Sequence, residues 1–269
     1  MRLPVALTIA GSDSGGGAGV QADLKTFAAL GCHGTSAITA ITVQNTLGVR
    51  DALDLPPDLI RAQIDAVVDD LAPRAIKTGM LSSAAIIAAV AGAVRERALE
   101  PLVVDPVMVA KGGHRLLAED AVASLRDRLL PLATIVTPNL PEAEVLLGRS
   151  LHTPREREAA ARDLVALGCR AAVVKGGHAE GDADDVLYDG ERVVWLRGDR
   201  VDTGNTHGSG CTFASAVAAG LARGLALEAA VREAKRFVTG AIRRSLEIGG
   251  GHGPVNPLWE LLPDALAAD

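Results

Sequence analysis

The sequence predicts an α/β protein with a mostly parallel central sheet covered by helices on both faces. Short apolar runs typical of buried strands alternate with longer amphipathic or alanine-rich segments typical of helices. Parallel strands need helical crossovers between them, and sheets built in this way are buried on both faces. The 269 residues are 48% hydrophobic, enough for a large core, and no linker, repeat or low-complexity stretch divides them. We therefore expect a single domain over residues 1–269.

The expected strands are short apolar runs, most of them followed by glycine or a polar residue. They lie at 5–10, 36–43, 50–55, 75–77, 102–104, 134–136 and 171–174. Two further runs, 186–188 and 193–196, flank Asp189-Gly190 and predict a β-hairpin.

The expected helices are the segments between these strands. Pro56-Pro57-Asp58 is typical of a helix start, and the apolar residues that follow share one helical face as far as Leu71. Gly31 is typical of a helix end. The other helices are expected at 18–30, 84–99, 118–130, 142–147, 154–167 and 227–246, from Thr212 onward, and near Leu258.

The composition disfavours several classes of protein. With 27 basic and 33 acidic residues the net charge is −6, whereas nucleic-acid binding needs a basic face. Two tryptophans, one tyrosine and three phenylalanines are too few for base-stacking platforms. Cys32, Cys169 and Cys211 are widely spaced, which indicates neither a disulfide framework nor a zinc site. Because the alanine-rich run 84–94 is too short to span a membrane, we expect a cytoplasmic protein without membrane or nucleic-acid partners.

A polar, glycine-rich loop at 202–212 runs into an apolar helical segment. Its three glycines allow turns that bring backbone N–H groups close to a ligand, and a helix starting near Gly210 would add its positive end. Cys211 lies where a helix N-terminus favours the thiolate. This combination suggests phosphoryl or acyl transfer, although a plain loop before a well-capped helix explains the same residues. No Gly-Lys dipeptide occurs, which excludes a Walker A loop.

Polar residues follow several of the expected strands directly. In an open parallel sheet, ligands bind outside the carboxyl ends of the strands, so these residues should converge on one edge beside the loop. Acidic residues next to an anion-binding loop indicate a magnesium nucleotide. A structural explanation is also available, since Asp105 could merely end a strand and Glu142 suits a first helical turn. The residues are Gly11, Asp13, Gln44, Gly79, Met80, Asp105, Asn139, Glu142 and Lys175.

Six motifs span almost the whole chain, and their order is informative. They are Gly11 to Asp23, Thr39 to Thr46, Lys77 to Met80, Val104 to Met108, Thr137 to Glu142 and His207 to Thr212. In this combination the chain resembles the hydroxymethylpyrimidine/phosphomethylpyrimidine kinase family of thiamine biosynthesis. The resemblance implies a ribokinase-like three-layer α/β/α sandwich. It also implies ATP-dependent phosphorylation of 4-amino-5-hydroxymethyl-2-methylpyrimidine and then of its monophosphate, giving the diphosphate.

The resemblance further implies roles for particular residues. Gln44 would pair with the pyrimidine edge. Cys211 stands where sugar kinases of the wider superfamily carry an aspartate base, and it would accept the hydroxymethyl proton. The backbone N–H groups of Gly208, Ser209 and Gly210 would hold the transferring phosphoryl group. Further substrate contacts would come from Gly11, Asp23, Met80 and Val107, ATP contacts from Asp105, Lys175 and Thr206, and Mg²⁺ ligands from Asn139 and Glu142.

Three other functions stay open at this point. A pyridoxine or pyridoxal kinase on the same fold is the nearest, because some members of this subfamily act on that similar ring. Cys211 in place of aspartate disfavours a sugar kinase, and the joint presence of the acids, Lys175 and Cys211 disfavours a silent binding protein. Alanine-rich helix faces and the hairpin at 186–196 suggest a homodimer. The sequence leaves open whether 107–115 closes as a lid.

Overall fold

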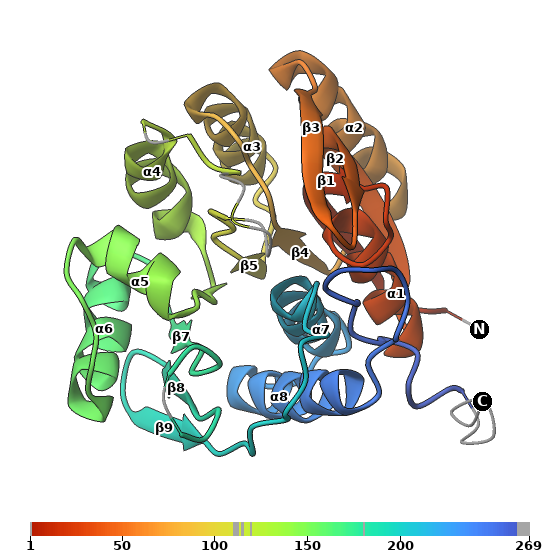
Figure 1. Ribbon diagram of the computed structural model, residues 1–269. Helices are drawn as coiled ribbons and strands as arrows, with labels where there is room; N and C mark the ends of the chain where they lie inside the picture. Colours follow the sequence, from red (N-terminus) through yellow and green to blue (C-terminus); the bar gives the residue numbers. More distant parts are fainter. Residues whose placement is uncertain (1, 110–112, 114–115, 119, 180, 263–269) are drawn as a thin grey trace.

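The computed structural model describes residues 2–109, 113, 116–118, 120–179 and 181–262. In this part of the chain a nine-stranded sheet has the order β3-β2-β1-β4-β5-β6-β7-β8-β9 (Figure 1). The strands are β1 (Val5–Asp13), β2 (His33–Asn45), β3 (Gly48–Asp54), β4 (Ala75–Thr78), β5 (Leu102–Val104), β6 (Ile135–Val136), β7 (Ala172–Val174), β8 (Asp185–Tyr188) and β9 (Val193–Leu196).

Six neighbouring strands, β2, β1, β4, β5, β6 and β7, are parallel. Strand β3 pairs with β2 in the antiparallel sense at one edge, and β8 and β9 add antiparallel pairs at the other. The expected mostly parallel sheet is therefore confirmed, and so is the predicted hairpin, which forms β8 and β9. Because parallel strands point the same way, the residues that follow β1, β4, β5, β6 and β7 lie along one edge.

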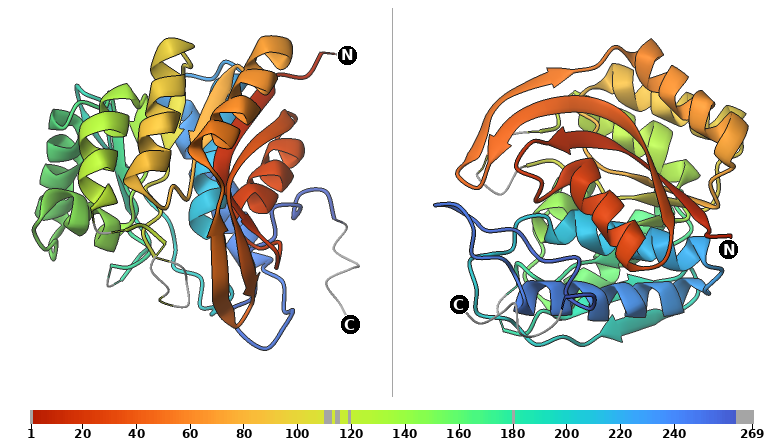
Figure 2. Two further views of the ribbon diagram at one scale, coloured as in Figure 1. Left: turned by 90° about the horizontal axis from the view of Figure 1, so that it is seen from above. Right: turned by 90° about the vertical axis from the view of Figure 1, so that its right-hand side faces the viewer.

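Helices cover both faces of the sheet, as Figures 1 and 2 show. Phe213 and Phe237 belong to the apolar cluster on one face, and Ile87 and Leu164 to the cluster on the other. This arrangement confirms the expected three-layer sandwich. One layer contains α1 (Gly19–Ala29), α7 (Ser209–Ala222) and α8 (Leu227–Arg243), and the other contains α2 (Pro57–Leu71), α3 (Ala84–Glu96), α4 (Ala121–Ser124), α5 (Leu140–Leu147) and α6 (Pro154–Ala166).

Several segments differ from the sequence-based expectation, and β2 is longer at both ends than the expected 36–43. Strand β1 continues to Asp13, because residues of the predicted loop pair with β2. The helix expected at 118–130 is only α4, followed by a π turn (Leu125–Leu129) and a 3₁₀ turn (Leu130–Leu132) that contains Pro131, which cannot donate a backbone hydrogen bond. Near Leu258 the chain makes hydrogen-bonded turns instead of a helix.

Strands β2 and β3 form a hairpin that extends past the other strands (Figure 2, left). It exposes apolar side chains, with Ile41, Val43 and Leu53 being 48%, 53% and 66% exposed. Gln44, which is predicted to contact the substrate, lies near the tip of this hairpin. None of the helices described has the length and hydropathy needed to cross a membrane.

Candidate active site

The carboxyl edge of the sheet brings predicted polar residues together beside the start of α7. Lys175 follows β7, and its Nζ lies 3.2 Å from Oδ1 of Asp105, which follows β5. Gly210 adjoins this pair, because a Cβ built on it would lie 3.4 Å from Lys175 Nζ and 3.7 Å from Asp105 Oδ2. These are ordinary van der Waals distances, so the helix N-terminus and the two charged side chains lie directly beside each other.

The glycine-rich loop folds as predicted into the N-terminus of a helix, which begins at Ser209. Gly208 has a φ of +79°, and a Cβ on it would lie only 1.8 Å from the carbonyl oxygen of Gly17. Only glycine permits this backbone and this approach. The N–H of Ser209 donates to the carbonyl oxygen of Thr206 at 3.2 Å, which closes the turn before the helix. The N–H groups of a helical first turn lack partners within the helix, so they are available to an anion, although the N–H of Ser209 would exchange its bond to Thr206 for one to the anion.

Cys211 is half-buried in the first turn of α7, and its sulfur accepts a hydrogen bond from the N–H of Gly19. Burial raises the pKa of the Cys211 thiol to about 12, because the ammonium of Lys77 offsets the loss of solvation only in part. The expectation of a favoured thiolate is therefore corrected. A helix N-terminus does face the sulfur, but removal from water outweighs it, and the resting side chain is the neutral thiol.

Asn139 and Glu142 form the capping box of α5. The Asn139 side chain accepts from the N–H of Glu142 at 2.9 Å, and Glu142 Oε2 accepts from the N–H of Asn139 at 2.8 Å. Burial raises the pKa of Glu142 to about 7, since the attraction of Lys175 compensates only partly and Asp105 adds repulsion. Among the described residues no group of three or more His, Cys, Asp or Glu could hold a metal ion.

These observations nevertheless fit a magnesium ion that arrives with a nucleotide. Mg²⁺ is commonly bound by one or two carboxylates plus phosphates and water, so a cluster of three protein ligands is not required. The carboxyl group of Glu142 is a hard oxygen donor whose ionised form is disfavoured by burial, and a bound cation would favour that form.

Asp23 is completely buried and has no surface exposed to solvent. Its carboxylate accepts hydrogen bonds from Lys77, Thr8 and Ser215. The expectation that Asp23 contacts the substrate is therefore corrected, because a fully buried and fully paired carboxylate has no surface for a ligand. The sequence placed it in the first turns of a helix beside a glycine-rich loop, which did not reveal the partners from distant strands.

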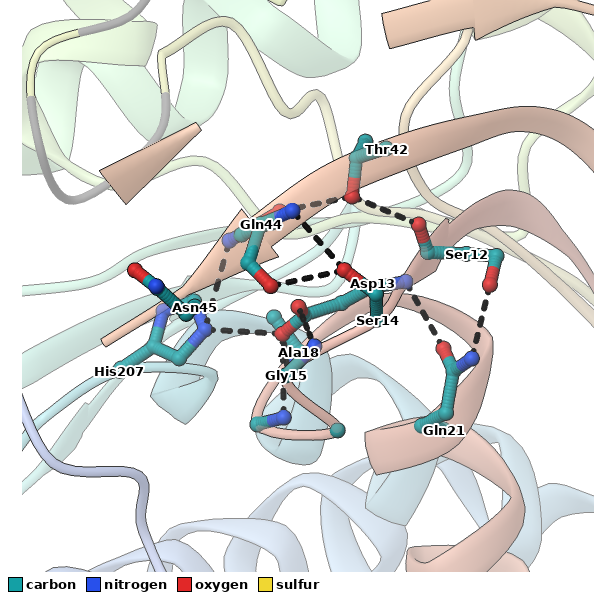
Figure 3. A network of polar contacts seen from close by, with 12 residues as sticks. Ser12, Asp13, Ser14, Gly15, Ala18, Gln21, Thr42, Gln44, Asn45 and His207 are labelled. Carbon is teal, nitrogen blue, oxygen red and sulfur yellow. Dashed lines mark hydrogen bonds and ion pairs between the residues drawn. The ribbon is translucent and has the colours of Figure 1, made fainter. Parts of the chain in front are cut away.

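Gln44 belongs to a network that the sequence did not reveal (Figure 3). Nε2 of His207 lies 2.9 Å from Oδ2 of Asp13 and 3.5 Å from Nε2 of Gln44, while the Thr42 hydroxyl donates to Oε1 of Gln44 at 3.1 Å. Burial opposes ionisation of Asp13, but hydrogen bonds from His207 and the N–H of Ala18 lower its pKa below the ordinary value. The network thus connects the side-chain amide of Gln44, near the tip of the β2–β3 hairpin, with the loop before α7.

The remaining predicted substrate residues are close to these groups. Gly11 faces Met80, because a Cβ on Gly11 would lie 3.0 Å from the Met80 sulfur. Val107 is half-buried, and its N–H donates to the carbonyl oxygen of Asp105 at 2.9 Å. Five of the residues that follow Val109 in the proposed lid, 110–112 and 114–115, lie outside the described residues.

Two residues at the site, His207 and Lys77, were not predicted there, and Asp13 was expected at this edge without a role or a partner. Asp13 and His207 lie within the recognised motifs, but nothing in their local sequence showed that they would pair. Lys77 ends an apolar strand and is fully buried against Asp23. A lysine inside an apolar strand pattern was the available signal, since a buried lysine requires a partner.

Comparison with known proteins agrees with this geometry. A family model described as phosphomethylpyrimidine kinase matches residues 13–256. A hydroxymethylpyrimidine/phosphomethylpyrimidine kinase of Streptomyces coelicolor is 53% identical over 258 residues, which cover 96% of each chain.

Two solved structures show the same ribokinase-like fold. A phosphomethylpyrimidine kinase of Clostridium difficile has a TM-score of 0.80 at 43% identity, covering 89% of this chain and 99% of that one. The ADP complex of Bacillus subtilis pyridoxal kinase has a TM-score of 0.91 at 41% identity, covering 97% and 100%. The extent of the sequence match decides the assignment: this chain belongs to the phosphomethylpyrimidine kinase family.

Proposed function

We propose that this kinase transfers the γ-phosphoryl group of ATP to 4-amino-5-hydroxymethyl-2-methylpyrimidine and then phosphorylates the monophosphate to the diphosphate. The observation that carries the proposal is the position of the α7 N-terminus. Gly210 adjoins the Lys175–Asp105 pair, and His207 in the same loop approaches Gln44. A phosphate-binding helix end thus separates a charged region from a region suited to a neutral ring.

On the donor side, the backbone N–H groups of Gly208, Ser209 and Gly210 would hold the transferring phosphoryl group. Lys175 would neutralise charge on the ATP phosphates, with Asp105 orienting its ammonium and Thr206 lining the nucleotide side of the loop. Asn139 and Glu142 would hold Mg²⁺, which supplies charge neutralisation to the polyphosphate.

On the acceptor side, Gln44 would pair through its amide with the amino group and ring nitrogen of the pyrimidine. An amide presents one donor and one acceptor side by side, which matches that edge. Gly11, Met80 and Val107 would line the rest of the ring site, where a side chain at position 11 would crowd the Met80 sulfur.

Cys211 would accept the proton of the hydroxymethyl group. A loose phosphoryl-transfer transition state needs positioning and charge stabilisation more than a strong base, so a small thiolate fraction suffices. The second acceptor is a phosphate that already carries negative charge and needs no such base. The role of Cys211 therefore concerns the first reaction.

The proposal is tested by incubating the purified protein with ATP, Mg²⁺ and the hydroxymethylpyrimidine, and following products by chromatography. The monophosphate should appear first and the diphosphate later. ATP consumption no faster than without acceptor would contradict the proposal.

Pyridoxal is a second candidate substrate, because the structural match to B. subtilis pyridoxal kinase is close. Turnover should be compared with both rings, in the wild type and in Gln44→Leu. If Gln44→Leu loses turnover of the pyrimidine but not of pyridoxal, the result supports pairing between Gln44 and the pyrimidine. Faster turnover of pyridoxal, unaffected by the substitution, would favour the second candidate.

We also propose that the chain is one kinase domain that acts in the cytoplasm as a homodimer. Membership of all nine described strands in one sheet supports the single domain. The apolar side chains Ile41, Val43 and Leu53 on the β2–β3 hairpin offer a surface for self-association. Light scattering on the wild type and on Val43→Lys would test the dimer, which the charge should weaken.

A further inference from the structure

Lys77 and Asp23 form an ion pair without solvent contact beneath the start of α7. Both side chains are 0% exposed, and Lys77 Nζ lies 2.8 Å and 3.0 Å from the two oxygens of Asp23. The proposed chemistry does not use either residue directly. Buried ion pairs are often no better for stability than apolar residues of the same size, so this pair invites a functional explanation.

The carboxylate of Asp23 is held by residues of three other elements. Besides Lys77 of β4, the hydroxyl of Thr8 in β1 donates to Oδ2 at 2.6 Å and the hydroxyl of Ser215 in α7 donates to Oδ1 at 2.7 Å. Asp23 itself belongs to α1. Burial alone would lower the pKa of Lys77, but the negative charge of Asp23 raises it above its ordinary value. The ammonium is therefore a permanent charge at a fixed position.

Helices α1 and α7 pack against each other, and two contacts join them one turn apart. The N–H of Gly19 donates to the sulfur of Cys211, and four residues further along each helix Ser215 donates to Asp23. Residues four apart lie on the same helical face, about 6 Å from each other along the axis. The sulfur of Cys211 thus lies one turn from the ion pair, on the face of α7 that looks at it.

The ammonium of Lys77 is also fixed by the strand end. A Cβ built on Gly79 would lie 2.7 Å from Lys77 Nζ and 2.9 Å from Cβ of Ala10. Glycine therefore leaves room for the lysine to lie across the end of β4 toward α7, instead of turning to solvent.

We propose that Lys77, fixed by Asp23, is a positioning residue that stabilises the thiolate of Cys211. The inference rests on the proposed role of Cys211 as proton acceptor and names the group that makes this role feasible. In a partly polar interior, an ammonium about 6 to 10 Å from a thiol changes the proton affinity of that thiol about 10- to 100-fold.

Other charges near Cys211 determine how the effect is measured. Among the described residues, the ammonium groups of Lys77 and Lys175 favour the thiolate, while the carboxylates of Asp23 and Asp105 disfavour it. Removing Lys77 should therefore make the thiol less acidic, and removing the charge of Asp23 should make it more acidic. A purely structural role predicts shifts in one common direction, since both changes would loosen the same contact between α1 and α7.

The experiment measures the rate of alkylation of Cys211 by iodoacetamide between pH 7 and 10.5. Tryptic peptides analysed by mass spectrometry separate it from Cys32 and Cys169, which lie in other peptides. At pH 8.5, Lys77→Met should slow alkylation about tenfold or more, and Asp23→Asn should accelerate it. Ser215→Ala removes a contact to Asp23 without changing a charge, so it should change the rate by less than about twofold.

Shifts of Lys77→Met and Asp23→Asn in the same direction would overturn the proposal, as would unchanged rates in both. An unpaired buried charge can prevent folding, so Lys77→Met/Asp23→Leu is measured as well, because it removes both charges. Its thiol should still be less acidic than in the wild type, since Lys77 affects Cys211 more than Asp23 does. An equally or more acidic thiol would overturn the proposal even if neither single variant folds.

The alkylation rate is read without ATP or a pyrimidine, so the two hypotheses fail separately. If the alkylation rate shifts in opposite directions in Lys77→Met and Asp23→Asn but the wild type does not turn over the pyrimidine, the electrostatic role of Lys77 stands and the proposed function is refuted. Pyrimidine turnover with no shifts would refute only the role of Lys77.

Discussion

The two sides of the 206–212 loop differ in how they are held together. On the acceptor side, Gln44 and His207 are placed by hydrogen bonds with fixed directions. On the donor side, Lys175 and Asp105 are placed mainly by their opposite charges. Hydrogen bonds recognise the edge of a neutral ring, whereas charge recognises a polyphosphate whose oxygens are interchangeable. Substitutions should therefore separate the two sides kinetically.

Cys211→Ala should have the largest effect, and only on the first phosphorylation. General acid–base catalysis contributes about 10²–10⁴-fold, so the first step should slow by that order while the second changes less than about tenfold. Because the thiol pKa is about 12, the wild-type first step should also accelerate as pH rises from 7 to 9. Rapid-quench assays started separately from the pyrimidine and its monophosphate measure both steps. Equal losses in both would indicate that Cys211 only positions the substrate.

Lys175→Met should come next and should slow both phosphorylations alike. Removing one preorganised charge from a phosphoryl-transfer site costs about 10²–10³-fold. Steady-state rates with either acceptor provide the measurement. Lys25→Met is a suitable control, because Lys25 is exposed and its ammonium donates to the carbonyl oxygen of Gly16 near the acceptor side. A loss confined to one acceptor would contradict the division into donor and acceptor sides.

Gln44→Leu should have a smaller effect, confined to the acceptor. Losing hydrogen bonds to a buried ring edge costs about 1–3 kcal/mol, so KM for the pyrimidine should rise about 10- to 100-fold. KM for ATP should stay within twofold of the wild type. Asn45→Ala, an exposed neighbour on the same strand, controls for damage to the hairpin. A matching rise in KM for ATP would show that Gln44 acts through the loop and not on the ring.

Much of the fold and part of the site could be predicted because their signals are local. Apolar runs define the strands, and the direction of a parallel sheet then brings residues such as Asp105 and Lys175 to one edge. The surroundings of Asp23 could not be predicted, since its partner Lys77 is 54 residues away in the sequence and the two meet only because α1 packs on β1, which pairs with β4. The prediction of a thiolate at Cys211 was wrong for a related reason. The helix N-terminus is visible in the local sequence, whereas the burial of the sulfur depends on how the whole site packs.

The smallest expected effect concerns stability and comes from Glu142 on the donor side. Its pKa is about 7 in the folded protein and 4.5 in an exposed carboxyl group, so folding favours the protonated form. The stability that this group contributes is thus complete below pH 4.5 and is lost as pH rises through 7. Glu142→Gln keeps a side-chain oxygen for the capping box and cannot ionise, so at pH 8 it should melt roughly 5 °C higher than the wild type. At pH 5 the two should melt together. If the wild type is the more stable protein at pH 8, the attraction between Glu142 and Lys175 outweighs the cost of burying the carboxylate, and the donor side is balanced in charge even without a nucleotide.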